Sequence, residues 1–375
     1  MPVTSRCPVP ISLADAIEGC ILGTAAGDML GLPFENLCRT HVARLLREPL
    51  EQSLWLGRGL VSDDTEHTLM LARSLLDEAG DATRFARRFA ARLRWWLLSG
   101  PPGVGGATAR GVLKLWLGWP PARSGVRSAG NGPAMRAALL GVVFADDPVR
   151  LRAFLHASVA VTHTDPRAHD GALAVACAAA CSRRLGACAP LAALDELQAM
   201  QARVRSGDDA FTDLIAAMRP ALRQGLLVAD YAQALGCGQA VTGFVMHTVP
   251  VAIYAWLRHA GDLRRGITDV IRCGGDTDSV AAIAGALIGA GVGPRGVPPS
   301  WLARTLEIPG TVARMRGLAR VLAGALAGGT PARRPALARL GEALWWPVML
   351  LRNMAMFALL IGVLVRRSTL VAWRR

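Results

Sequence analysis

The chain has 375 residues, of which 52% are hydrophobic, 5% are aromatic and 19% are charged, and its formal net charge is +14. This length and apolar content are enough for a large buried core, and strand-like alternation of apolar and polar residues is scarce, so we expect an all-α globular fold. The positive charge does not indicate a nucleic-acid partner, because eleven arginines and one acid fall within residues 311–375 and no zinc-finger or helix-turn-helix spacing occurs.

Residues 1–18 contain prolines and acids but no apolar stretch, so they do not resemble a secretory signal. The eight cysteines are scattered along the chain, and none forms a C-x2-C pair. This usage is typical of reduced thiols. We therefore expect a cytoplasmic protein.

The first polar cluster comprises Ser62, Asp63 and Asp64, and follows a stretch at 19–35 that reads GCILGTAAGDMLGLPFE. After the cluster, apolar residues recur on one helical face, and this spacing predicts a helix over 65–76. The cluster would then stand at a helix N-terminus, where hydroxyls and carboxylates cap free N–H groups. Capping alone would explain these residue types, and metal binding is the functional alternative.

Proline and glycine are frequent in residues 100–133, which form either a linker or loops around a helix at about 109–117. Within this stretch, Gly130, Asn131 and Gly132 make a turn. Such a turn either precedes a helix or offers successive backbone N–H groups to an anion such as pyrophosphate. The residues alone leave both interpretations open.

A helical run at 151–161 leads to His163 and Asp165, just before Pro166. A single histidine is more often a core or capping residue than a ligand. Further along, Gly243 and Phe244 follow a Gly-Cys-Gly-Gln segment at 236–239. Neither segment indicates a function without other evidence.

The second polar cluster comprises Asp276, Asp278 and Ser279, and precedes a run at 280–290 that is apolar nearly all round, as in a buried helix. Ionised carboxylates are costly to bury unless they are paired or bind a cation. Carboxylate and hydroxyl oxygens are hard ligands that suit Mg²⁺ or Mn²⁺. The two clusters, brought together, would hold one or two divalent ions.

Five blocks of the chain resemble the ADP-ribosylglycohydrolase family, which includes the dinitrogenase-reductase-activating glycohydrolases. The order and spacing of these blocks, spread over about residues 12–323, are more specific than any single block. The blocks are 19–35, 62–71, 130–141 (GNGPAMRAALLG), 162–172 (THTDPRAHDGA) and 273–290 (CGGDTDSVAAIAGALIGA).

The resemblance implies a compact, all-α, multi-helix fold around a binuclear metal cleft, with loops rather than a linker at 100–133. It implies that two Mg²⁺ or Mn²⁺ ions bind to Ser62, Asp63, Asp64, Asp276, Asp278 and Ser279. Glu35 would orient or deprotonate the attacking water, and Asp64 is the second catalytic candidate. The implied substrate contacts are Gly130, Asn131, Gly132, Met135, His163, Gly243 and Phe244.

The implied reaction is hydrolysis of an ADP-ribosyl bond at the ribose C1″, in ADP-ribosylated protein or a small ADP-ribose adduct. One position departs from the family. Some glycohydrolases of the dinitrogenase-reductase type carry an Asp in a Pro-Phe-Asp-Ile-Gly loop, where this chain has Gly103. Glu35 is the first candidate to replace that Asp. A non-catalytic protein that binds ADP-ribose or metal on the same fold is the alternative.

Residues 1–323 are expected to form the catalytic domain, and residues 324–375 a basic, apolar tail with a turn at 328–335. Residues 343–365 are apolar except for Arg352 and Asn353, and the uninterrupted run 354–365 is too short to span a membrane. Two interpretations have equal weight. Residues 343–375 either anchor the protein to an anionic surface at the inner face of the membrane, or form a helix docked on the core or on a second subunit. A spanning helix ranks third.

Overall fold

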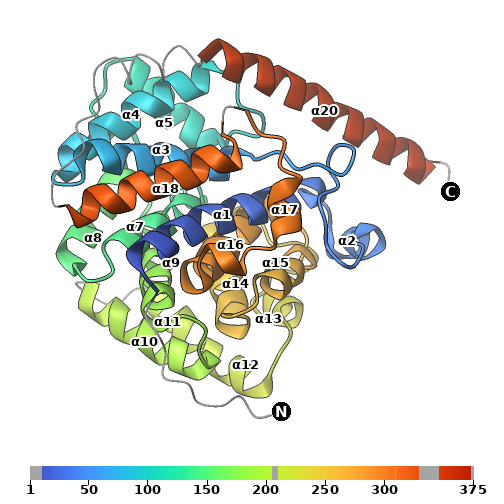
Figure 1. Ribbon diagram of the computed structural model, residues 1–375. Coiled ribbons are helices and arrows are strands. Elements are labelled where there is room, and N and C mark those ends of the chain that lie inside the picture. Colours follow the sequence, from blue (N-terminus) through green and yellow to red (C-terminus); the bar gives the residue numbers. More distant parts are fainter. Residues whose placement is uncertain (1–10, 205–209, 309, 329–345, 373–375) are drawn as a thin grey trace.

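The prediction of an all-α fold is confirmed for the described part of the chain, which comprises residues 11–204, 210–308, 310–328 and 346–372 of the computed structural model. Within these ranges the regular elements are helices, and extended segments meet only as isolated bridges. Figure 1 shows the helices arranged around a central pair, α1 (Leu13–Gly31) and α16 (Thr277–Val292). This pair places the polar clusters.

The central helices pack so closely that their backbones touch. Glycines recur at every fourth position of α1, from Gly19 to Gly31. A Cβ atom on Gly23 would lie 2.1 Å from the Gly285 carbonyl oxygen, and one on Gly285 would lie 2.2 Å from the Gly23 carbonyl oxygen. Only glycine fits at such a crossing. The contact brings the end of α1 next to the start of α16.

The other helices surround this pair. The first group, before the middle of the chain, is α2 (Arg39–Leu45), α3 (Asp63–Glu78), α4 (Ala82–Leu98), α5 (Gly106–Trp116), α6 (Pro121–Ser124), α7 (Ala138–Val143), α8 (Pro148–Ala160) and α9 (Pro166–Leu185). The second group is α10 (Pro190–Val204), α11 (Ala210–Ala216), α12 (Met218–Gln224), α13 (Val228–Ala234), α14 (Val245–Arg258), α15 (Leu263–Ile271), α17 (Pro299–Ala303), α18 (Val312–Ala327) and α20 (Trp346–Ala372). Short 3-10 turns are η1 (Leu32–Phe34), η2 (Ala134–Arg136) and η3 (Pro294–Gly296).

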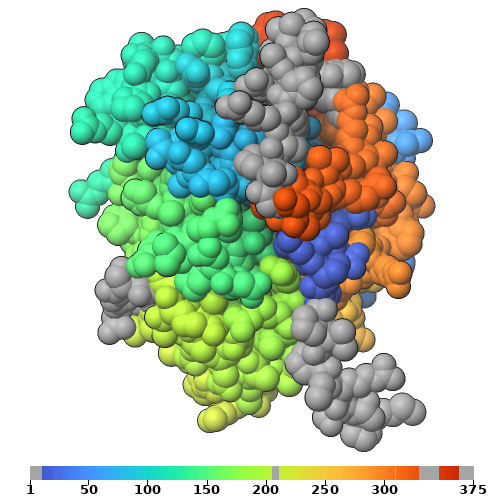
Figure 2. Space-filling model, turned by 60° about the vertical axis from the view of Figure 1, so that its left-hand side comes forward, coloured from blue at the N-terminus to red at the C-terminus, as the bar shows by residue number. Residues whose placement is uncertain are grey.

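The predicted helices at 65–76, 109–117, 151–161 and 280–290 correspond to α3, α5, α8 and α16. Each observed helix begins two or three residues earlier than predicted. Polar or proline residues begin α3, α8 and α16, and Gly106 begins α5, so the apolar spacing starts only after them. The predicted domain boundary after residue 323 lies within α18, which packs against α1; Figure 2 shows α18 in orange beside the start of α1 in blue.

The apolar tail contains α20, and the first half of this helix docks on the core. Asn353 and Met356 are buried, and Met356 packs with Leu32 and Leu54. Docking, one of the two sequence-based interpretations, therefore describes this part of the tail. The outer side of α20 exposes Leu351, Met354, Phe357 and Ile361.

A membrane span is a separate question. None of the helices in the described ranges combines the length and apolarity that crossing a bilayer requires. The predicted turn at 328–335, apart from Gly328, lies outside the described residues, as do residues 343–345 and the final Trp-Arg-Arg. Figure 1 shows the far end of α20 extending away from the body of the protein.

Candidate functional site

The two polar clusters meet at a cleft of about 490 Å³. Most of the residues predicted for the site line it: Glu35, Asp63, Gly130, Asn131, Gly132, Met135, His163, Gly243, Asp276, Asp278 and Ser279. A second hollow of about 590 Å³ between η3 and α18 is mainly apolar and has none of these groups. Of these two hollows, the first is therefore the candidate site.

Asp64 joins the two clusters beneath the cleft. Ser62 is the N-cap of α3, and its hydroxyl donates to Asp64 Oδ2 at 3.2 Å. Ser279, from the first turn of α16, donates to the same oxygen at 3.2 Å. Asp64 itself is fully buried and is not among the residues that line the cleft. The catalytic role predicted for Asp64 stays a prediction, for a carboxylate that lies beneath the cleft and not on its wall.

A glycine turn positions the second cluster. Gly275 has a φ of +89°, and a Cβ there would lie 2.0 Å from the Val241 carbonyl oxygen. This turn lets the Asp276 N–H donate to that oxygen at 2.7 Å, and lets the Gly275 carbonyl accept from the Asn36 N–H at 2.8 Å. Asp276 and the segment that follows Glu35 are thus fixed to the same turn.

Asp276 stands at the N-cap of α16 but makes no capping hydrogen bond. Its Oδ2 instead accepts from Asn131 Nδ2 at 2.6 Å, and the same amide group donates to Thr248 at 3.1 Å. The side chain is thereby turned from its own helix toward the loop at 130–132. Asn131 holds a carboxylate of the cleft in place.

Two carboxylate oxygens of these clusters are buried without a hydrogen-bond partner among the described residues. Oδ1 of Asp64 and Oδ1 of Asp278 are buried and have no hydrogen-bond partner in the described part of the protein. Burial and the charges of neighbouring carboxylates raise the pKa of Asp63, Asp64 and Asp278 well above the usual range. A divalent ion would relieve both penalties.

The donor set suits Mg²⁺ or Mn²⁺, because it consists of carboxylate and hydroxyl oxygens. Across the described ranges, no three His, Cys, Asp or Glu side chains already converge as a preformed metal cage. The predicted ligand set also includes the hydroxyls of Ser62 and Ser279, and serine is not one of those four residue types. The residues present therefore fit an ion held by serine and aspartate together.

Glu35 is a half-buried carboxylate of the cleft whose Oε1 accepts from Asn36 Nδ2 at 3.2 Å. Burial, and then the charge of Asp276, raise its pKa above the usual range. Gly103 lines the same cleft with a φ of +77° and contributes no carboxylate. Glu35 therefore lines the cleft as a carboxylate, whereas Gly103 offers no ionisable group.

The loop at 130–132 uses its first two backbone amides within the protein, which bears on the anion-binding interpretation of this turn. The N–H of Gly130 donates to Ser128 at 3.3 Å, and that of Asn131 donates to the Gly243 carbonyl at 3.0 Å. These amides are already used, so no nest of free N–H groups forms from them. Gly132 has another role, because a Cβ there would lie 3.1 Å from Cε1 of His163. The glycine makes room for the histidine.

His163 lines the cleft as a neutral group. Its Nδ1 shares a hydrogen bond of 2.9 Å with the Thr162 hydroxyl. Burial, and then the charge of Arg136, lower its pKa to about 3. Phe244, in contrast, is not among the residues lining the cleft. Its ring packs over Arg167, and its backbone bridges to Gly130.

Sequence reasoning missed two buried charges that support the site. Asp28, in α1, accepts from the N–H of Ser62 at 2.9 Å and from both the N–H and the hydroxyl of Thr65. Burial raises the pKa of Asp28, and these hydrogen bonds offset part of the rise, so that the net pKa is about 6. Arg136 donates to the Gly132 carbonyl at 3.0 Å. Asp28 and Arg136 could have been found in the sequence, because each is an ionisable residue within an apolar stretch.

Comparison with known proteins agrees with this geometry. The sequence model of the ADP-ribosylglycohydrolase family matches residues 10–334. An uncharacterised protein of Archaeoglobus fulgidus is 32% identical over 77% of this chain and 91% of its own. ADP-ribosylhydrolase ARH3 of Gallus gallus is 29% identical over 76% and 87%.

A bacterial relative and a solved structure give the same picture. The ADP-ribosyl-[dinitrogen reductase] glycohydrolase of Rhodospirillum rubrum is 24% identical over 78% of this chain and 91% of its own. A solved structure described as an ADP-ribosylglycohydrolase-related protein complex superposes with a TM-score of 0.62, at 26% identity, over 84% of this chain and 98% of that chain. The similarity thus extends across all five sequence blocks.

Proposed function

The chain belongs to the ADP-ribosylglycohydrolase family, and on that premise we propose that it is a metal-dependent hydrolase that releases ADP-ribose from ADP-ribosylated protein or a small adduct. Family membership supports hydrolysis of ADP-ribosyl compounds. One observation carries the metal dependence: the two clusters meet and leave the buried Oδ1 atoms of Asp64 and Asp278 without a partner.

Two Mg²⁺ or Mn²⁺ ions would be held by Ser62, Asp63, Asp64, Asp276, Asp278 and Ser279. When bound, such ions act as Lewis acids and lower the pKa of water. The protein's contribution is to hold these oxygens in place. Asp28 fixes the start of α3 through the Ser62 N–H, and Asn131 fixes Asp276.

Glu35 acts as the general base. A carboxylate oxygen of Glu35 takes a proton from water while the water oxygen forms a bond to C1″ of the ribose. The bond from C1″ to the leaving atom breaks, and that atom is released with its electron pair and then protonated. The transition state has oxocarbenium character, as in other glycoside hydrolysis. Partial burial and the charge of Asp276 raise the pKa of Glu35, which favours uptake of that proton.

The rest of the cleft supplies neutral groups for ADP-ribose. Thr108, Ser128 and His163 offer hydrogen-bonding atoms, and Met135 offers an apolar surface. We place the substrate against these residues and the loop at 130–132. Since His163 is neutral, it binds through hydrogen bonding or packing rather than as a cation.

A binding protein without turnover is the second candidate, and Gly103 is the observation that favours it. If the reaction needs a carboxylate at that loop, the cleft would bind ADP-ribose without cleaving its adducts. The remaining carboxylate, Glu35, favours catalysis. A hydrolase would release free ADP-ribose from its substrate, whereas a binding protein would bind ADP-ribose without releasing it from any linkage.

The test is a panel of arginine-linked and serine-linked ADP-ribosylated proteins, incubated with the full chain in Mg²⁺ or Mn²⁺ and, separately, in EDTA. We expect free ADP-ribose from at least one linkage, and none in EDTA. Binding of ADP-ribose measured by calorimetry, with no release from any linkage, would instead establish the binding protein.

A further inference from the structure

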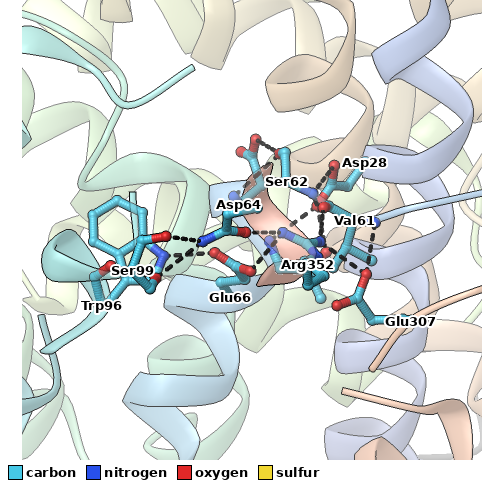
Figure 3. A network of polar contacts seen from close by, with 11 residues as sticks. Asp28, Val61, Ser62, Asp64, Glu66, Trp96, Ser99, Glu307 and Arg352 are labelled. Carbon is cyan, nitrogen blue, oxygen red and sulfur yellow. Dashed lines mark hydrogen bonds and ion pairs between the residues drawn. The ribbon is translucent and has the colours of Figure 1, made fainter. Parts of the chain in front are cut away.

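The C-terminal helix sends one charged side chain into the interior, next to the start of α3. Arg352 has a side chain 9% exposed, and it forms ion pairs with Glu66 at 3.0 Å and with Glu307 at 2.8 Å. It also donates to the Val61 carbonyl and to the Asn353 side chain. Figure 3 shows the Arg352 side chain between Glu66 and Glu307. One arginine therefore joins α20, α3 and the loop that follows α17.

Val61, the residue before the N-cap of α3, is held through both of its backbone polar groups. Its N–H donates to Glu307 at 3.3 Å, and its carbonyl accepts from Arg352. The next N–H, that of Ser62, donates to both carboxylate oxygens of Asp28 at 2.9 Å. Three buried charged side chains thus fix the segment that leads into α3, and one of them comes from the C-terminal helix.

The position of this segment decides where the Ser62 hydroxyl lies. That hydroxyl donates to Asp64, the carboxylate that also accepts from Ser279. If the peptide between Val61 and Ser62 shifted, the hydroxyl would move away from Asp64, and the link between the two clusters would weaken. Arg352 acts on the site through Val61 and through Glu66, one helical turn beyond Ser62.

Arg352 lies between two buried carboxylates, those of Glu66 and Glu307, so a residue without a positive charge would leave both unpaired. The Glu66 and Glu307 side chains are 8% and 2% exposed. The second oxygen of Glu66 accepts from the Trp96 indole, which ties the same network to α4. Breaking a buried ion pair on one side leaves uncompensated charge in the interior. Withdrawal of Arg352 would therefore disturb α3 at its first turn.

From these contacts we propose that Arg352 is a positioning residue for the candidate metal site, supplied by docking of the C-terminal helix. The inference rests on the proposed function in one respect, which is that Ser62 and Asp64 are ion ligands. When α20 is docked, Arg352 holds the start of α3 in place. When the Arg352 side chain no longer contacts Val61 and Glu66, the affinity of the site for the divalent ion falls. Loss of a residue that orients metal ligands typically costs about 10- to 100-fold in affinity.

The test measures Mn²⁺ binding to the full chain by calorimetry, with thermal unfolding followed on the same samples. Arg352→Gln removes the positive charge and leaves two N–H donors in place of five. The matched control is Arg92→Gln, which removes a 2.6 Å ion pair with Asp77 near the other end of α3, with side chains 13% and 6% exposed. We expect both variants to lower the melting temperature, and only Arg352→Gln to weaken Mn²⁺ binding, by about tenfold.

Arg352→Lys is a second variant in case Arg352→Gln does not fold, because lysine keeps a positive charge between Glu66 and Glu307. One ammonium group cannot reproduce the guanidinium geometry that serves two carboxylates and the Val61 carbonyl. Its Mn²⁺ affinity should therefore fall as well, by less than that of Arg352→Gln. Wild-type affinity in a folded Arg352→Gln or Arg352→Lys variant would overturn the proposal. Absence of Mn²⁺ binding in the wild-type protein would instead refute the metal site itself.

Discussion

The Ser279 hydroxyl donates a hydrogen bond of 3.2 Å to the Asp64 carboxylate, across a separation of 215 positions in the chain. Each residue lies in the first turn of a helix, one in α16 and the other in α3. Anions are favoured at helix N-termini, so both helices help to hold negative charge in this place. The contact is the direct structural link between the two carboxylate clusters.

Asp278→Asn should stabilise the ion-free protein and abolish ion binding. The substitution keeps the shape of the side chain and removes a buried charge whose Oδ1 has no partner. In EDTA at about pH 8 we expect a gain of roughly 1–3 kcal/mol in the free energy of unfolding, with no further gain on adding Mg²⁺. Denaturant unfolding with and without Mg²⁺ measures both. A loss of stability in EDTA would show that the carboxylate already has a favourable partner.

The stabilisation by Mg²⁺ should grow with pH. Burial raises the pKa of Asp63, Asp64 and Asp278 above the unfolded value. The ion-free folded state then binds more protons than the unfolded state, so its stability is highest below the ordinary carboxyl pKa and falls as pH rises through the raised values. Mg²⁺ needs the deprotonated ligands.

The measurement is the Mg²⁺-induced change in melting temperature between about pH 5 and about pH 8. We expect a small change at the acidic end and a progressively larger one toward the basic end. A change that is independent of pH would contradict a site made of these carboxylates.

Glu35→Gln should separate ion binding from turnover. The amide keeps a hydrogen-bond acceptor for Asn36 but cannot take a proton. We expect kcat to fall by about 10²- to 10⁴-fold, with Mn²⁺ affinity retained. Steady-state kinetics and calorimetry on one preparation provide the comparison. If kcat stays at the wild-type value, the base lies elsewhere.

Asn131→Ala should weaken ion binding through Asp276. The substitution removes the 2.6 Å hydrogen bond to Oδ2 of Asp276, so that carboxylate can turn back to cap α16. We expect a loss of about tenfold in Mg²⁺ affinity. Asn131→Asp should instead destabilise the ion-free protein, because it places a like charge beside Asp276. Equal affinity in the wild type and Asn131→Ala would show that Asp276 is held without the amide.

The close packing of α1 on α16 should make Gly23 intolerant of any side chain. Gly23→Ala places a methyl group 2.1 Å from the Gly285 carbonyl oxygen, and should cost about 3 kcal/mol or more. Gly317, within α18, has open space at its Cβ position, so Gly317→Ala should gain up to about 1 kcal/mol. Denaturant melts of both variants test the pair. Similar effects from the two alanines would refute backbone contact at the crossing.

Helix positions could be predicted from the sequence because they depend on local spacing. The polar residues Ser62 and Asp276 mark helix starts within the chain itself, and the apolar runs that follow give the rest. That these two starts face each other could be expected only from the family resemblance. The antiparallel glycine contact that brings them together involves residues more than 250 positions apart.

Other features depend on contacts that sequence spacing does not encode. Asp28 is the only acid in its part of an apolar helix, and its role becomes visible only where it meets the N–H of Ser62. In the sequence, Arg352 interrupts the apolar run at 343–365. In the structure, its side chain contacts Glu66 and Val61, where that segment docks on the core. The sequence leaves two interpretations of the turn at 130–132 open, and only the structure shows that Ser128 and Gly243 accept the hydrogen bonds of the Gly130 and Asn131 amides.

The most direct measurement of the central claim is release of ADP-ribose from arginine-ADP-ribosylated protein by the full chain. It compares the wild type in Mg²⁺, the wild type in EDTA, and Asp276→Ala combined with Asp278→Ala in Mg²⁺. The account predicts release only in the first sample. Equal release in all three would contradict a hydrolase whose site is built from the two carboxylate clusters.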